Sequence, residues 1–230
     1  IRNCDWSSDV CSSDLQYFVG VKDKVLFGTC SETTRTSCHS KDLVDLSSAS
    51  ICLMATGNCG GTTNQVTGVS GASDFPSLIS LVASKDGWVT TLPDSGERAL
   101  SRPVAIGGLV LFPTFVPTSG TCGAQGESYL YALYYLTGSA YSSPVLGTES
   151  SGGETYIKRS TKLGSGMASQ AVVHIGAGGA GGGAKAFIQK STAEMVAIET
   201  NMASEAIVSR FVTWYHARDR KSTRLNSSHS

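Results

Sequence analysis

The sequence predicts an all-β fold on three observations. Short runs of β-branched and aromatic residues recur about every ten residues, with turn residues between them. Glycine is frequent, at 26 of 230 residues, and charged residues make up only 16% of the chain, which indicates a turn-rich globular protein. No alternation of strands and helices precedes residue 170. Strands at this spacing are typical of a sandwich, a barrel or a propeller.

The charge balance excludes two classes of partner. Lys and Arg total 18, and Asp and Glu total 18, so the net charge is zero. A nucleic-acid-binding surface requires a basic excess, and so does attraction to an anionic membrane surface. No apolar run approaches the roughly 18 residues that a membrane-spanning helix needs. We therefore expect no nucleic-acid partner and no membrane-spanning segment.

The two ends of the chain are predicted to lie outside the fold and to be disordered. Residues 5–15 read DWSSDVCSSDL and residues 219–229 read DRKSTRLNSSH, both rich in serine and without an apolar period. These two stretches resemble translations of the two strands of one sequencing-adapter DNA. We expect residues 1–15 and 218–230 to be artefacts of assembly, and residues 16–217 to be a metagenomic fragment of a longer protein.

The elements expected in the first part of this fragment are short. Residues 16–28 predict two β runs about a turn, and residues 51–55 predict a short apolar strand. Residues 60–74, rich in Gly, Thr and Ser, predict a loop or an edge strand. The apolar spacing of residues 75–85 (FPSLISLVASK) fits a short helix, whereas its Ile and Val also allow a strand.

The signals that predict strands are stronger after residue 86. Residues 87–92 alternate with period two, and the runs 103–106 and 109–115 flank Gly107-Gly108, which is a hairpin signature. Residues 128–136 form an aromatic run that ends at Thr137-Gly138. Further strands are expected as two weak runs within 145–163, and then at 170–175, 185–189, 195–199 and 207–214.

Five cysteines lie between the two ends. Cys30 and Cys38, and Cys52 and Cys59, are separated by short loops that suit local disulfides and an oxidising compartment. Free buried thiols remain an alternative, as does zinc with His39 beside Cys38, although no C-x₂₋₄-C knuckle is present. Cys122 has no local partner and is expected to pair outside the fragment.

One motif points to a different class of protein. Gly176, Gly178 and Gly181 form G-x-G-x-x-G directly after an apolar run, and Glu199 follows where a ribose-binding acid would lie. This spacing matches a dinucleotide fingerprint, so a nucleotide- or quinone-dependent oxidoreductase is the alternative function. The motif requires a helix that begins within Gly181-Gly182-Gly183, where each glycine costs about 1 kcal/mol relative to alanine. A flexible hairpin loop between two strands is the simpler interpretation.

Other candidate chemistry is sparse, and no catalytic residue is predicted. Glu97 and Arg98 are adjacent and would point to opposite faces of a strand, and a structural charge-assisted bond is the simpler role for them. His174 is expected to lie in the core or at a strand edge. The nucleophile motif G-x-S-x-G is absent from the sequence. One group of aromatic residues fits either a stacking platform for a ligand or packing between sheets: Trp88, Tyr129, Tyr131, Tyr134 and Tyr135.

The central stretch carries a specific resemblance. Residues 86–138 contain, in order, a Gly-Trp strand, Gly-Glu-Arg before Ser-x-Pro-Val, a Gly-Gly hairpin into Phe-x-Thr, and then Pro, Cys and a Ser-Tyr-Leu-Tyr-Ala-Leu strand. This pattern resembles the C-terminal β-propeller of PilY-type type IV pilus tip adhesins. Residues 185–199 resemble the final blade of that family, and residues 209–215 its closing strand.

The resemblance implies a partial β-propeller with quinoprotein-like blades, of which this fragment supplies about three. Because rings of this kind have at least four blades, the ring is expected to be incomplete. The implied function is non-enzymatic: pilus biogenesis, cell adhesion and twitching motility, with the protein at the pilus (fimbrium) tip or outer membrane, exported through the periplasm. The implied partners are type IV pilins, minor pilins, and a host or abiotic surface.

Two features of the family are missing from residues 16–217. The N-terminal adhesion domain, often of von Willebrand type, is absent, and no D-x-D-x-D calcium loop occurs, because Asp42 and Asp45 lack the required spacing. Calcium therefore belongs only to the full-length family, and no cofactor or metal ligand is expected in this fragment.

Overall fold

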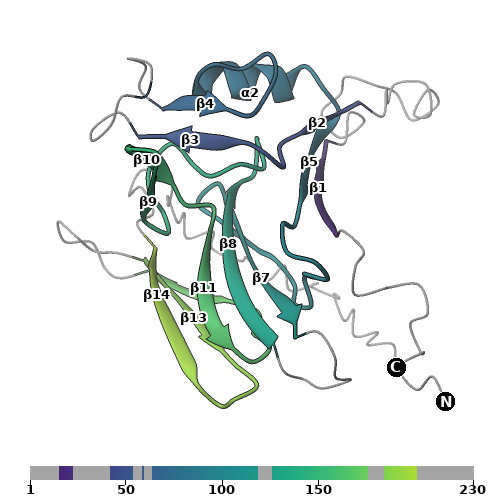
Figure 1. Ribbon diagram of the computed structural model, residues 1–230. Coiled ribbons are helices and arrows are strands. Elements are labelled where there is room, and N and C mark those ends of the chain that lie inside the picture. Colours follow the sequence, from purple (N-terminus) through teal and green to yellow (C-terminus); the bar gives the residue numbers. More distant parts are fainter. Residues whose placement is uncertain are drawn as a thin grey trace, which may run out of the picture.

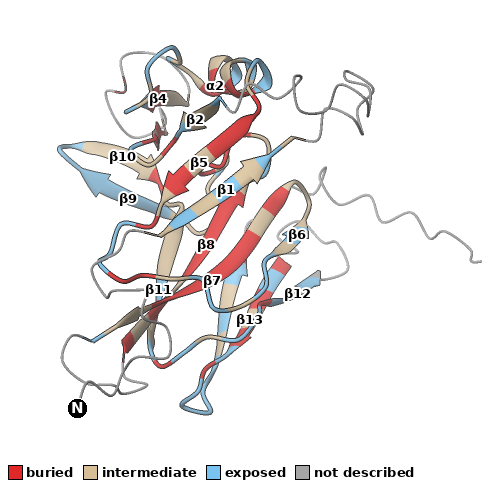
Figure 2. Cartoon of the chain, turned by 90° about the vertical axis from the view of Figure 1, so that its right-hand side faces the viewer, coloured by how far each residue is buried: buried red, intermediate tan, exposed pale blue. Residues whose placement is uncertain are grey.

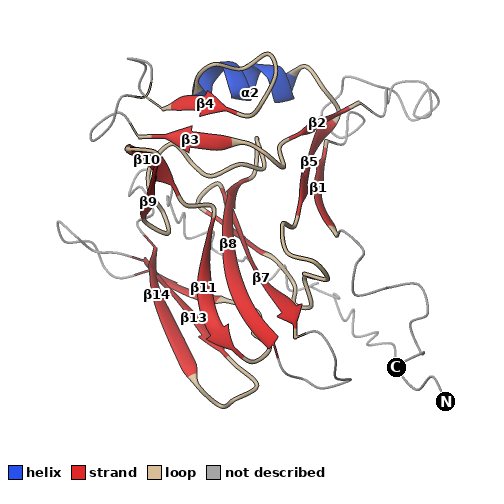
Figure 3. Ribbon diagram, viewed as in Figure 1, coloured by secondary structure: helices blue, strands red, loops and turns tan. Residues whose placement is uncertain are grey.

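The computed structural model describes residues 16–22, 42–53, 59, 64–118, 126–175 and 184–200. Within these ranges the chain forms fourteen strands and one helix, and the strands are arranged in four small sheets (Figure 1, Figure 3). The all-β prediction is thus confirmed for the described part of the chain. These sheets do not close into a ring within that part, and the propeller stays a prediction.

The first sheet has the order β1-β5-β2. Its middle strand, β5 (Gly87–Thr91), pairs antiparallel with β1 (Tyr17–Val21) and parallel with β2 (Leu43–Asp45). The predicted period of two in β5 is present, because Trp88 and Thr90 are buried while the alternate positions Val89 and Thr91 are half-buried.

The second sheet joins segments that are far apart in the sequence. Its order is β4 (Gln65–Thr67), β3 (Ser50–Cys52), β10 (Glu154–Ile157) and β9 (Thr148–Ser151), with every pair antiparallel. β4 is therefore an edge strand, as the composition of residues 60–74 allowed. The segment 145–163, from which two strands were expected, supplies three, and two of them pair in this sheet.

The helix α2 (Phe75–Ala83) resolves the ambiguity of residues 75–85. Asp74 caps the N-terminus of α2. The Asp74 carboxylate accepts the Ser77 backbone N–H at 2.8 Å, and the Asp74 backbone N–H donates to the Ser77 hydroxyl at 3.0 Å. This capping box, followed by Pro76 in the first turn, fixes where the helix begins. α2 lies over the sheet that contains β3 and β4 (Figure 1), and its buried side chains are Phe75, Leu78 and Val82.

The third sheet, which we call the central sheet, has the order β11-β8-β7-β6 and is antiparallel throughout. The predicted hairpin is present: β6 (Val104–Ile106) and β7 (Leu109–Pro117) are joined by Gly107 and Gly108 at φ values of 55° and 78°. A two-residue turn with both φ values positive suits glycine best. The remaining strands are β8 (Gly126–Tyr134) and β11 (Ser160–Ser165).

The two middle strands of the central sheet, β7 and β8, are buried on both faces (Figure 2). Phe112 and Leu133 point into the largest core, which also contains α2 and residues of the first two sheets. Leu111, Ala132 and Leu130 point to the opposite side. Burial on both faces explains why β7 and β8 read as nearly continuous apolar runs rather than as strict alternation.

The fourth sheet covers that second face. Its strands β12 (Val172–Ile175), β13 (Ala184–Gln189) and β14 (Met195–Thr200) form an antiparallel meander. Ala186 and Ile188 of β13 pack against Leu130 and Leu163 of the central sheet. Two antiparallel sheets are therefore stacked face to face.

Several expectations concern residues outside the described ranges. They are the second run of 16–28 after residue 22, the strand 207–214, the closing strand 209–215, and the two ends 1–15 and 218–230.

Candidate functional site

Trp88 lies in a tight cradle of two glycines. Its indole is 4% exposed, and Nε1–H donates to the backbone oxygen of Tyr135 at 2.9 Å. A Cβ added at Gly20 would lie 2.3 Å from the indole ring, and one added at Gly138 would lie 2.1 Å from it. The Gly-Trp and Thr-Gly elements of the sequence pattern therefore meet in space and form one packing unit.

A stack of aromatic rings links β1 to the central sheet. Phe18 stacks on Phe112 with ring centroids 3.9 Å apart, and Phe112 stacks on Tyr131 at 5.1 Å. Trp88 and Tyr131 are both buried, so they pack between sheets and offer no open platform to a ligand. Of the five aromatics considered, Tyr135 is the most exposed, at 51%, while Tyr129 and Tyr134 are half-buried.

Glu97 is a fully buried carboxylate. It accepts hydrogen bonds from the Thr114 hydroxyl at 2.5 Å and from the Asp94 backbone N–H at 3.2 Å. Burial, together with the nearby Glu97 carboxylate, raises the pKa of the Tyr131 phenol far above its usual value. Glu97 thus joins β7 and β8 to the loop before β6, which is the structural role expected for it.

Arg98 does not pair with Glu97. Its backbone exchanges hydrogen bonds with Phe115 of β7, at 3.0 and 2.9 Å, and its side-chain Nε–H donates to the Gly96 carbonyl at 3.1 Å. The Gly-Glu-Arg motif therefore adds a short backbone bridge to the edge of the central sheet, and carries no reactive pair.

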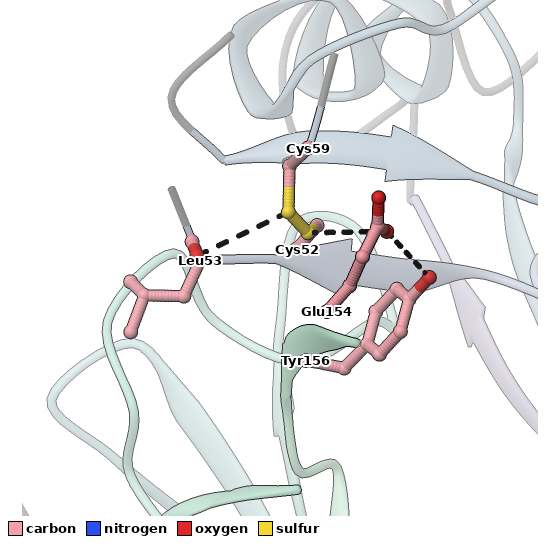
Figure 4. Close-up of a disulfide and its surroundings, with 5 residues drawn as sticks. All are labelled: Cys52, Leu53, Cys59, Glu154 and Tyr156. Carbon is pink, nitrogen blue, oxygen red and sulfur yellow. Dashed lines mark hydrogen bonds between the residues drawn. A yellow bond between two sulfur atoms is a disulfide. The ribbon is translucent and has the colours of Figure 1, made fainter. Parts of the chain in front are cut away.

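A disulfide joins Cys52 of β3 to Cys59 (Figure 4). The Glu154 carboxylate oxygen Oε2 lies 3.8 Å from Cys52 Sγ and accepts the Tyr156 hydroxyl at 2.9 Å. This hydrogen bond raises the pKa of Tyr156. Cys52, Cys59 and Glu154 form the group of possible metal ligands that the described residues contain. Because the disulfide consumes both thiolates, it leaves only the carboxylate to bind a cation.

The remaining sequence-predicted cysteines, Cys30, Cys38 and Cys122, lie outside the described residues, as does His39. Their pairing stays a prediction.

The glycine motif does not lead into a helix. Gly176, Gly178 and Gly181 lie outside the described residues, but the segment that follows them is the strand β13, which pairs antiparallel with β12. A dinucleotide fingerprint requires a helix at this position and a parallel crossover. Glu199 lies on β14, where it is 78% exposed and forms an ion pair with Lys185 at 3.3 Å. Within the described residues, the dinucleotide interpretation of this motif therefore lacks the helix on which it depends.

His174 lies on β12, an edge strand of the fourth sheet, and its side chain is exposed. Its cross-strand neighbour is Lys185. The edge position was one of the two places predicted for it.

A small polar pocket, which no sequence motif indicates, lies between the first two sheets. Its volume is about 200 Å³. It forms where the turn between β2 and β3 meets the second sheet and the link from β10 to β11. The residues that line it are Ser47, Ser48, Ala49, Ser50, Ala140, Glu149, Tyr156, Ile157 and Arg159. The two halves of this wall, 47–50 and 140–159, lie 90 positions apart at their nearest residues, and no motif connects them.

No protein-family model, curated protein or solved structure matches this chain. Within the described part of the chain, no helix has the length and apolar character that spanning a membrane requires.

Proposed function

We propose that this chain is a non-enzymatic component of a type IV pilus tip, with a role in pilus assembly and surface adhesion. The proposal assigns it to the bacterial cell surface, which it reaches through the periplasm. Its partners would be pilins, minor pilins and the surface to which the pilus attaches.

The observation that carries the proposal is the role of the motif residues. Trp88 and Glu97 come from the Gly-Trp and Gly-Glu-Arg elements of the resemblance, and Gly138 ends the aromatic run that closes it. Each of the three is buried and holds strands together. A pattern whose residues serve packing is what a repeated structural blade requires, whereas a catalytic motif would place reactive groups in an open site.

The stacking of sheets also supports the proposal. The central sheet is a four-stranded antiparallel sheet, and the three-stranded meander of β12, β13 and β14 packs on one of its faces. Propeller blades are four-stranded sheets that stack in this manner. The Cys52–Cys59 disulfide fits a protein that matures in an oxidising compartment such as the periplasm.

Antibody labelling of the source bacterium tests this function. Antibodies raised against the chain should label pilus ends and the cell surface by immunogold electron microscopy, and a strain that lacks the gene should lose both the label and surface attachment. Label confined to the cytoplasm, or unchanged pili and attachment in the deletion strain, would contradict the proposal.

A further inference from the structure

The pocket between the first two sheets has a preorganised wall. Asp45, at the end of β2, accepts hydrogen bonds from the Ser47 backbone N–H at 2.9 Å and from the Ser47 hydroxyl at 2.6 Å. These bonds lower the pKa of Asp45, so its carboxylate stays ionised and holds the turn at neutral pH. The turn that carries Ser47, Ser48 and Ser50 is therefore fixed before any ligand arrives.

Arg159 supplies a half-buried positive charge to this pocket. Its Nη1 donates to the Ser47 backbone oxygen at 2.9 Å and to the Thr90 hydroxyl at 3.5 Å. Among the described residues, no carboxylate lies within ion-pair distance of it. A guanidinium has five N–H donors, so several of them remain for an acceptor in the pocket.

Glu149 supplies a negative charge to the lining of the same pocket. It lies on the exposed edge strand β9, and within the described ranges its carboxylate forms neither an ion pair nor a hydrogen bond. Arg159 and Glu149 line the same pocket without pairing with each other. Opposite charges held apart in this way complement a ligand that carries an acid at one end and hydrogen-bond donors at the other.

The size of the pocket limits the ligand. A volume of about 200 Å³ is below the roughly 300–1,000 Å³ of sites for drug-sized molecules. Tyr156 forms part of the wall, and its hydroxyl donates to Glu154 beside the disulfide (Figure 4). The pocket therefore suits a molecule of the size of one sugar or one amino acid.

We propose that this pocket binds a small carboxylate that also carries hydroxyl or ammonium groups. Arg159 would bind the carboxylate through charge-assisted hydrogen bonds, which are about twice as strong as neutral ones. Glu149 would accept from the donor groups, and Ser48 and Ser50 would add hydroxyl contacts at the rim. This inference stands on the pocket alone and does not rest on the proposed pilus function.

The test is a titration of the full chain followed by NMR. The probes are D-galacturonate and L-serine, which represent the two sources of this chemistry, and D-galactose, which lacks the carboxylate. Galacturonate or serine should bind in the millimolar range and shift the amide signals of residues 47–50 and 149–159. Galactose should bind at least tenfold more weakly, equivalent to about 1.4 kcal/mol. Preference for galacturonate would assign a sugar acid, and preference for serine an amino acid.

Variants locate the binding. Arg159→Gln should weaken it at least tenfold, whereas Lys158→Gln, which removes the neighbouring positive charge outside the pocket, should leave it unchanged. Arg159→Lys keeps the charge but loses the planar fork, and should give an intermediate loss. If Arg159→Gln does not fold, Arg159→Lys and Glu149→Gln, the latter on an exposed strand, decide the question. No shift with either acid, equal binding of galactose, or unchanged binding in these variants would overturn the proposal.

Discussion

The glycine cradle of Trp88 gives a sharp test of the packing described above. Gly138 has a φ of 64°, and a Cβ there would lie 2.1 Å from Trp88 Cε3. In Gly138→Ala the left-handed backbone costs about 1–2 kcal/mol, and overpacking against the indole adds about 1–3 kcal/mol. We therefore expect the free energy of unfolding to fall by about 2–5 kcal/mol.

Gly152 provides a matched control. Its φ of 62° is nearly the same, but a Cβ there would meet no heavy atom within 4 Å. Gly152→Ala should therefore cost only the backbone part, about 1–2 kcal/mol. Urea unfolding followed by far-UV circular dichroism measures both variants, and their difference isolates the contact with Trp88.

A double-mutant cycle completes this test. In a Trp88→Leu background, where the indole is absent, Gly138→Ala should cost no more than Gly152→Ala. If Gly138→Ala and Gly152→Ala destabilise the wild-type chain equally, the cradle does not hold Trp88 as described.

Three further perturbations follow from the same structure. Glu97→Ala should lower the free energy of unfolding by about 1–3 kcal/mol in urea melts, because it leaves the buried Thr114 hydroxyl without its acceptor; a loss below the error of the melts would contradict this role. The double variant Cys52→Ala/Cys59→Ala should lower the free energy of unfolding by about 2–3 kcal/mol, since the closed loop is short. An unchanged free energy of unfolding in this variant would show that the disulfide does not constrain the unfolded chain. Hydrogen bonds from Ser77 lower the pKa of Asp74, so its contribution to stability should be present above the unfolded pKa of 3.8 and be lost as the pH falls through the lower folded pKa. In urea melts at a series of pH values, Asp74→Asn should flatten the dependence of the free energy of unfolding on pH in this acidic window. An unchanged dependence would refute the assignment.

The local elements of the fold were largely predictable from the sequence. Gly107-Gly108 between two apolar runs predicts a hairpin because such a turn needs positive φ at both positions. The apolar pattern of residues 75–85 does not decide between helix and strand, because Ile79 and Val82 also suit strands. The signal that settles it is the capping box of Asp74 and Ser77, which the apolar pattern alone does not contain.

The arrangement of the strands was not predictable in the same way. β3 pairs with β10 through Cys52 and Tyr156, which are more than a hundred residues apart, and no local pattern encodes that partnership. The pocket depends on this pairing, because it brings the turn at Ser47 near Arg159. Residues that meet only through long-range contacts, such as Arg159 and Glu149, therefore carry no signal in the sequence.

Sequencing the genomic locus beyond both ends of the chain tests the central claim most directly, namely that these stacked sheets are blades of a pilus-tip protein. The reading frame should continue into further strand repeats with the Gly-Gly hairpin pattern, and pilin genes should lie beside it. A frame that instead continues into alternating strands and helices, without neighbouring pilin genes, would contradict the claim.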